Sequence, residues 1–166
     1  VIGGGDWSKD RLIPDCARSW SKKKNVTIRN PNSTRPWQHV LEAVWAYILF
    51  ASKLKTKKKL NGHAFNFGPN NKKNYSVLDL LNEMKKHWKN VRYSIKKSKK
   101  FHESNLLKLN CKKAQKYLGW GNILTFNENI RLTAEWYQNF YSDHKKIKNL
   151  SINQIKDYKK KFINNI

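Results

Sequence analysis

Short strand-like segments that alternate with longer helical segments are the feature of this 166-residue sequence that most limits its fold. The predicted strands, where apolar or aromatic residues alternate with others, are residues 1–2, 25–29, 63–68 and 91–95. The predicted helices are residues 10–21, 37–55, 76–88, 111–118 and 125–141, with a terminal helix from residue 151. This order is typical of an α/β protein. The strands are too few for a complete wound sheet, so the sequence indicates a piece of a longer protein.

The helix predicted over residues 37–55 has the widest apolar face. Its apolar residues recur at helical spacing and are Val40, Leu41, Val44, Trp45, Ile48 and Leu49. We therefore expect this helix to be the central element of the core. Asp10 is expected to cap the helix over residues 10–21.

Positive charge dominates the surface chemistry of the chain. Lysine and arginine number 35 against 11 acidic residues, which gives a net charge of +24. A basic block can bind nucleic acid by releasing counterions from phosphates, or it can decorate solvated helix ends. Because the lysines are not interleaved with aromatic residues as single-strand binders require, we favour the second reading. A basic nucleic-acid-binding module is kept as the alternative from another class of protein.

Several classes of protein are excluded by what the sequence lacks. No apolar run approaches the roughly 18 residues that a membrane-spanning helix needs. Cys16 and Cys111 are too few for a disulfide framework, and the dispersed histidines have no metal-ligand spacing. We therefore expect a cytoplasmic protein without a metal site or a membrane partner.

Motifs for catalysis and cofactor binding are also weak. Residues 3–5 are three glycines but do not form G-x-G-x-x-G, so they are either a mobile turn or a close approach to a ligand. Two Tyr-x-x-x-Lys pairs, at Tyr93 and Tyr141, are what chance provides in so lysine-rich a chain. We assign no catalytic residue and no cofactor-binding residue to this chain.

Arginines in polar loops near aromatic residues are the best candidates for ligand binding. A guanidinium can bind a phosphate through two hydrogen bonds, and a neighbouring aromatic side chain can support a ring. An alternative is that Arg35 pairs with Glu42 and that Trp37 begins the apolar face of a helix. The candidate residues are Arg11, Arg29, Arg35, Trp37 and His39.

Several strings carry a family resemblance. They are VIGGGDW (1–7), DRLIPD (10–15), IRNPNSTRPWQHV (28–40), AFNFGP (64–69) and LGW (118–120). Read in order, they resemble the C-terminal half of an extended short-chain dehydrogenase/reductase of the NAD-dependent epimerase/dehydratase family, and within it the enzymes that dehydrate CDP-glucose. The most specific string is residues 29–40, because many relatives have Arg-Asp-Trp or Arg-Asp-Phe at residues 35–37.

The resemblance implies a fold and a division of the chain. The fold would be the C-terminal, substrate-binding portion of an extended Rossmann-type sugar-nucleotide enzyme: α/β, helix-rich, with a few short strands. The N-terminal part that binds NAD and carries the catalytic Tyr-x-x-x-Lys would lie outside this chain. Residues 1–141 would form the sugar-nucleotide-binding part, and residues 142–166 a basic C-terminal helix or tail.

The resemblance also implies an activity and roles for residues. The complete enzyme would be a lyase, a homodimer or larger, that uses NAD to convert CDP-glucose to CDP-4-keto-6-deoxyglucose and water. Arg35 matches the arginine that contacts the diphosphate, and Arg11 and Arg29 match segments that line the nucleotide. His102 and Glu103 fall at a polar turn that contacts ligand in relatives. Another sugar-nucleotide epimerase or dehydratase is the alternative within the enzyme class.

Overall fold

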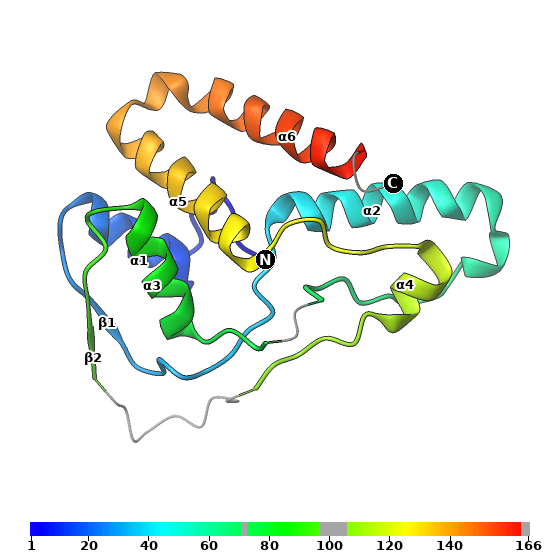
Figure 1. The fold of residues 1–166 in the computed structure, drawn as a ribbon, viewed down its shortest axis with the longest axis horizontal. Helices are drawn as coiled ribbons and strands as arrows, with labels where there is room; N and C mark the ends of the chain where they lie inside the picture. The colour runs from blue at the N-terminus through cyan, green and yellow to red at the C-terminus, as the bar shows by residue number, and fades with distance from the viewer. Residues whose placement is uncertain (71–72, 97–105, 164–166) are drawn as a thin grey trace.

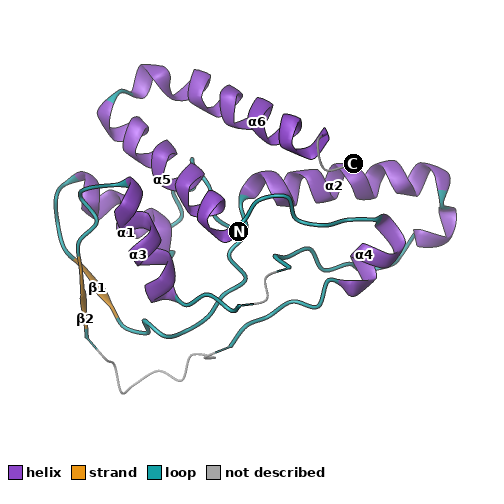
Figure 2. Cartoon of the chain, in the orientation of Figure 1, coloured by secondary structure: helices purple, strands orange, loops and turns teal. Residues whose placement is uncertain are grey.

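A computed structural model describes residues 1–70, 73–96 and 106–163 of the chain. These residues form mostly helices, joined by long loops and accompanied by short strands (Figures 1 and 2). The elements in order are α1 (Leu12–Ser21), β1 (Val26–Ile28), α2 (Val40–Thr56), η1 (Lys58–Leu60), α3 (Val77–His87), β2 (Tyr93–Ile95), α4 (Lys112–Leu118), α5 (Phe126–Ser142), η2 (His144–Lys146) and α6 (Ile147–Ile163). The predicted helix-rich α/β character is confirmed.

Two strands pair in parallel. In this pair β1 lies beside β2 with Thr27 opposite Ser94, and the buried Ile28 lies on the side of the core, as expected. At the N-terminus, Ile2 forms a single parallel bridge to His39 rather than a strand. The strand predicted over residues 63–68 is wrong: this segment is an irregular loop. Its phenylalanines pack against rings of α2 and of the α4 region instead.

The main core lies between α1, α3 and α5, next to β1. Trp20 of α1 is fully buried, meets Trp88 edge to face at 5.7 Å and donates its indole N–H to the Arg92 carbonyl at 2.9 Å. Tyr137 of α5 is also fully buried and donates to the Asp6 carbonyl. These contacts fix the N-terminal segment and the β1–β2 pair against the helices.

The expectation that α2 is the centre of the core is wrong. Val44 is 45% exposed, Ile48 is 56% exposed and Tyr47 is 66% exposed, whereas Glu42 and Ala46 of the same helix are fully buried. Neighbouring elements cover α2 on one side only, where Ala46 packs in a second cluster with residues of α4. The apolar surface of α2 is therefore wider than the face that the described residues cover.

The start of α1 also differs from the prediction. Asp10 has a φ of 61°, which is left-handed backbone, and Arg11 occupies the N-cap without a side-chain hydrogen bond to the helix. Asp10 thus lies one residue before the position from which a side chain caps a helix.

Residues 143–163, which follow α5, fold back along the molecule as η2 and α6 (Figure 1). The Gln154 amide donates to the Leu132 carbonyl at 3.0 Å, and Phe162 packs on Trp45 of α2 with ring centroids 4.1 Å apart. The helix begins at Ile147, before the predicted start. A division of the chain at residue 141 stays a prediction. None of the described helices combines the length and the apolarity needed to cross a membrane.

The N-terminus of α3 is closed by a reciprocal cap. The Ser76 hydroxyl accepts from the Asp79 N–H at 3.0 Å, and the Asp79 carboxylate accepts from the Ser76 N–H at 2.8 Å. We expect Ser76→Ala to lower the free energy of unfolding by about 1 kcal/mol, because it leaves a helix N–H without its acceptor. Urea denaturation measures the effect. Ser52→Ala, at an exposed position within α2, is the control and should cause no loss; equal losses in both variants would contradict the role of the cap.

Candidate functional site: an arginine-lined cavity

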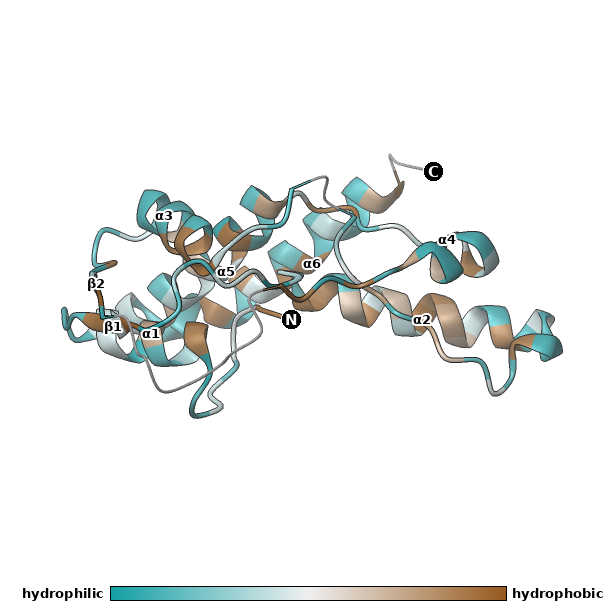
Figure 3. Ribbon diagram, turned by 90° about the horizontal axis from the view of Figure 1, so that it is seen from below, coloured by the Kyte–Doolittle hydropathy of each residue, from teal (hydrophilic) through white to brown (hydrophobic). Residues whose placement is uncertain are grey.

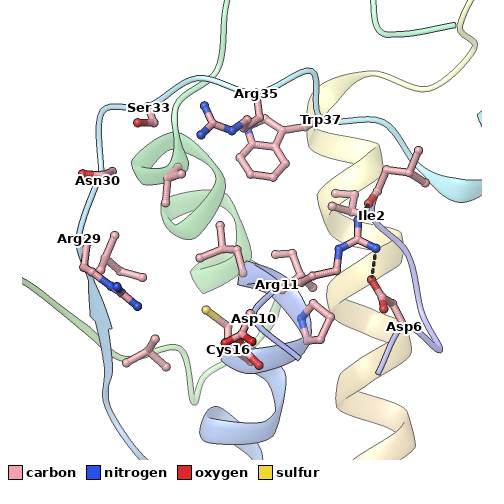
Figure 4. A pocket seen from close by; sticks show the side chains of 18 of the residues that line it. Ile2, Asp6, Asp10, Arg11, Cys16, Arg29, Asn30, Ser33, Arg35 and Trp37 are labelled. Carbon is pink, nitrogen blue, oxygen red and sulfur yellow. Dashed lines mark hydrogen bonds and ion pairs between the residues drawn. The ribbon is translucent and has the colours of Figure 1, made fainter. Parts of the chain in front are cut away.

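A cavity of about 850 Å³ opens between the N-terminal segment, the start of α1, strand β1 and the loop that leads to α2 (Figure 4). Three of its lining residues are Arg11, Arg29 and Arg35. The fold thus brings together arginines that lie in three separate segments of the sequence. Trp37, the fourth sequence candidate in this region, lines the same cavity.

Strand β1 places Arg29 at the cavity. Arg29 and Asn30 follow the carboxyl end of β1, and ligands of α/β proteins bind beyond the carboxyl ends of parallel strands. The Arg29 side chain is exposed and extends into the cavity (Figure 4). No hydrogen bond or ion pair of its guanidinium is found within residues 1–70, 73–96 and 106–163. Its charge therefore has no matched carboxylate there.

The backbone of Tyr75 fixes Arg35 and Trp37 side by side at another wall (Figure 4). The Tyr75 carbonyl accepts from the Arg35 backbone N–H at 3.3 Å and from the Trp37 indole N–H at 3.0 Å. The Arg35 guanidinium donates to the Thr34 carbonyl at 2.8 Å, which orients it. Glu42, the alternative partner of Arg35, is instead bonded to the N–H groups of residues 123 and 124 and to Tyr158.

Arg11 is matched by a carboxylate. Its guanidinium lies 3.1 Å from the Asp6 carboxylate (Figure 4). Burial alone would raise the pKa of Asp6, but the hydrogen bonds from Ser8 and the charges of Arg11 and Arg18 outweigh it and lower that pKa. Asp6 is thus ionised at neutral pH and neutralises Arg11. Arg29 is therefore a stronger candidate than Arg11 for binding a phosphate.

The other candidate binding residues either do not line the cavity or lie outside the residues that the structure describes. His39 does not line the cavity: it is the buried N-cap of α2, and its Nδ1 accepts from the Leu41 N–H at 3.3 Å. Burial lowers the pKa of His39 to about 4, so the ring is neutral at pH 7. His102 and Glu103 lie outside the described residues.

Cys16 lines the cavity but is unsuited to nucleophilic chemistry. It is fully buried, and burial, together with the charge of Asp15, raises the pKa of its thiol to about 12. A thiol of such a pKa is protonated and unreactive near neutral pH. Within the described part of the chain, no group of three histidine, cysteine or acidic side chains is arranged to hold a metal ion.

The glycines near the cavity serve internal packing. A Cβ on Gly4 would overlap the ring of Trp136, and a Cβ on Gly3 would lie 2.7 Å from a methyl group of Val40. The close approach that Gly3 and Gly4 allow is therefore to side chains of this chain. Since the sequence also lacks G-x-G-x-x-G, these residues do not fit a dinucleotide pyrophosphate. We assign no residue of this chain to NAD.

Sequence reasoning did not single out Asp6, Asn30 or Ser33, which also line the cavity. Ser33 is buried, and its carbonyl accepts from the N–H of Val77 at the start of α3. The signal that was present is the polar turn of residues 30–33 directly after a strand, where α/β folds gather ligand contacts. Nothing in the sequence around Asp6 indicated a role at the cavity, because only the fold brings Asp6 next to Arg11.

Solved structures of other proteins share this fold. UDP-glucuronic acid 4-epimerase from Bacillus cereus, in complex with UDP-glucuronic acid and NAD, matches with a TM-score of 0.69 and 18% identity over 84% of this chain and 43% of that chain. The dTDP-glucose 4,6-dehydratase from Bacillus anthracis, in complex with NAD, matches with a TM-score of 0.63 and 18% identity over 89% of this chain and 44% of that chain. The chain therefore has the fold of part of an extended Rossmann-type sugar-nucleotide epimerase or dehydratase.

Sequence similarity points to one such enzyme. The chain is 40% identical over 139 residues to CDP-glucose 4,6-dehydratase from Salmonella typhimurium, a match that covers 83% of this chain. It spans 39% of the length of that relative. No family model matches the chain. The resemblance to the NAD-dependent epimerases and dehydratases is confirmed by these homologues.

Proposed function

We propose that this chain is the C-terminal, sugar-nucleotide-binding part of a CDP-glucose 4,6-dehydratase. The observation that carries the proposal is the cavity with Arg29, Arg35 and Trp37 on its walls, in a chain 40% identical to part of such an enzyme. In the complete enzyme, the reaction would be the lyase conversion of CDP-glucose to CDP-4-keto-6-deoxyglucose and water. We further propose a cytoplasmic enzyme that acts as a homodimer or larger assembly.

The chemistry of the cavity suits a diphosphate joined to rings. Two guanidinium groups on different walls can hold the diphosphate through charge-assisted hydrogen bonds. The indole of Trp37, fixed through its N–H, offers an apolar surface to the sugar or the base. NAD, when bound, would accept hydride from the sugar and return it, and in this proposal that part of the reaction belongs to residues outside the chain. This chain would bind and orient the substrate.

We expect CDP-glucose to bind the chain saturably and both Arg29→Ala and Arg35→Ala to weaken binding about tenfold or more, since a hydrogen bond to a charged group contributes about 1.5–3 kcal/mol. Isothermal titration calorimetry measures the dissociation constants. Arg131→Ala is the matched control, because Arg131 pairs with Glu135 on α5 and does not line the cavity. This variant should bind like the parent protein.

Comparator ligands separate the alternatives. UDP-glucose and dTDP-glucose test whether the chain belongs to an enzyme for another sugar nucleotide. If either of them bound more tightly than CDP-glucose, the assignment of cytosine as the nucleotide base would be overturned. Duplex DNA at two salt concentrations tests the basic module. DNA binding that survives high salt, in the absence of any sugar-nucleotide binding, would replace the proposed function by nucleic-acid binding.

A further inference from the structure

An exposed apolar stripe runs along the first three turns of α2. We define the α2 stripe as Val40, Val44, Tyr47 and Ile48, whose exposed fractions range from 37% to 66%. These positions recur at helical spacing, so they form one continuous face. Val1, 56% exposed, lies next to Ile2, which is bonded to the start of this helix. Contiguous exposed apolar surface is typical of sites that contact a protein, a membrane or a ligand.

The distribution of charge shows that the stripe is not ordinary solvated surface. This chain carries 35 lysines and arginines, yet residues 40–52 contain none, and their one charged residue, Glu42, is buried. Beyond this point the exposed side of α2 becomes polar, with Ser52, Lys55 and Thr56. Figure 3 shows brown and pale residues along α2 that give way to teal at its far end. The apolar surface is thus confined to the end of α2 near the N-terminus of the chain.

The backbone at this end indicates what kind of element covers the stripe. The Ile2 N–H donates to the Gln38 carbonyl at 2.7 Å, and the Val40 N–H donates to the Ile2 carbonyl at 2.8 Å, which is parallel pairing. A helix that begins where a parallel strand ends packs on the face of the parallel sheet. In the described residues this pairing is a single bridge, which is too small to cover a helix.

The relatives indicate which part of a longer protein could cover the α2 stripe. More than half of each relative lies outside the match, which covers 39% of the Salmonella enzyme and 43% or 44% of the two solved chains. Resting on the proposed function, we propose that the α2 stripe is the surface on which the cofactor-binding part of the dehydratase docks, extending the parallel bridge at Ile2. In this arrangement α2 covers one face of the extended sheet and holds the arginine-lined cavity against the cofactor-binding part.

A chimaera tests this inference. The matched 139-residue segment of the Salmonella enzyme is replaced by the corresponding residues of this chain, and Val44→Asp/Ile48→Asp is introduced into both the chimaera and the 166-residue chain. In the chimaera we expect the melting temperature to fall by about 5–10 °C, or soluble protein to be lost, because charge is buried at the contact. In the chain alone, where the stripe is exposed, the melting temperature should change by less than about 2 °C.

Two controls keep the test decisive. Ser52→Asp adds charge on the same side of α2 beyond the stripe and should leave the chimaera unchanged. Val44→Ala/Ile48→Ala removes contact without adding charge, and amide exchange of residues 43–51 should then be at least about tenfold faster than in the parent chimaera.

Two outcomes would overturn the inference. One is an equal effect of the stripe and Ser52 variants in the chimaera. The other is a dimer of the 166-residue chain, seen by its mass in solution, that Val44→Asp/Ile48→Asp dissociates, since a second copy would then occupy the stripe. None of these measurements uses a sugar nucleotide. Loss of CDP-glucose binding with α2 docking intact would therefore remove the proposed function alone.

Discussion

Replacing Glu42 by alanine is expected to lower the free energy of unfolding by about 4 kcal/mol, because each buried donor left without an acceptor costs about 1–3 kcal/mol. The fully buried Glu42 carboxylate accepts from the N–H groups of Ile123 and Leu124 at 2.7 and 2.6 Å and from the Tyr158 hydroxyl at 3.1 Å. It therefore joins α2, the loop before α5, and α6. Chemical denaturation followed by circular dichroism measures the loss.

Glu42→Gln is the matched control. The amide oxygen can still accept from both backbone N–H groups, and the amide nitrogen can donate to the Tyr158 hydroxyl. We expect this variant to lose less than about 1 kcal/mol. A loss as large as that of the alanine variant would show that the charge itself, and not hydrogen bonding, holds the three segments.

We also expect the difference in stability between the parent protein and Glu42→Gln to depend on pH. Burial raises the pKa of Glu42 although the hydrogen bonds and Lys161 act to lower it, so the folded protein holds a proton at pH values where the unfolded chain has released it. The stability contributed by this group therefore falls as the pH rises from the ordinary pKa of a glutamate through the raised one. Glu42→Gln should gain stability relative to the parent protein over that interval, and denaturation at several pH values measures the difference.

Gly4→Ala is the second substitution with a large expected effect. The added Cβ would overlap the Trp136 ring, whose indole N–H is tied to the Ser151 hydroxyl of α6 at 2.9 Å. Either the N-terminal segment or α5 must shift, and we expect a loss of about 3 kcal/mol, the upper end of ordinary overpacking. Thermal and urea unfolding measure it.

Gly121→Ala provides the comparison, because a Cβ there meets nothing within 4 Å and the residue has no positive φ. This variant should be neutral or slightly more stable, since alanine restricts the unfolded chain. A small loss at Gly4 would mean that the Trp136 ring moves aside freely and that packing does not require a glycine at this position. If the N-terminal segment shifts in Gly4→Ala, the wall of the cavity that contains Gly3 should move with it.

Local structure and the resemblance could be read from the sequence alone. The caps at Ser76 and Thr125 form as expected, because a capping box depends only on residues within one turn. Strand β1 and the stop of α4 at Gly119, with a φ of 68°, also follow from neighbouring residues. The strings shared with the dehydratases sufficed to identify the fold that the comparisons confirm.

The pairing of distant side chains was decided by the tertiary structure. Glu42 had Arg35 as its plausible partner in the sequence, but the fold brings residues 123, 124 and 158 to it. Arg11 and Arg29 could not be told apart in the sequence until the fold placed Asp6 beside Arg11. Likewise, helical periodicity identified the apolar face of α2, but only the neighbouring elements determine which part of that face is covered. Periodicity records the apolar width of a helix, whereas burial and charge neutralisation depend on contacts between segments far apart in the chain.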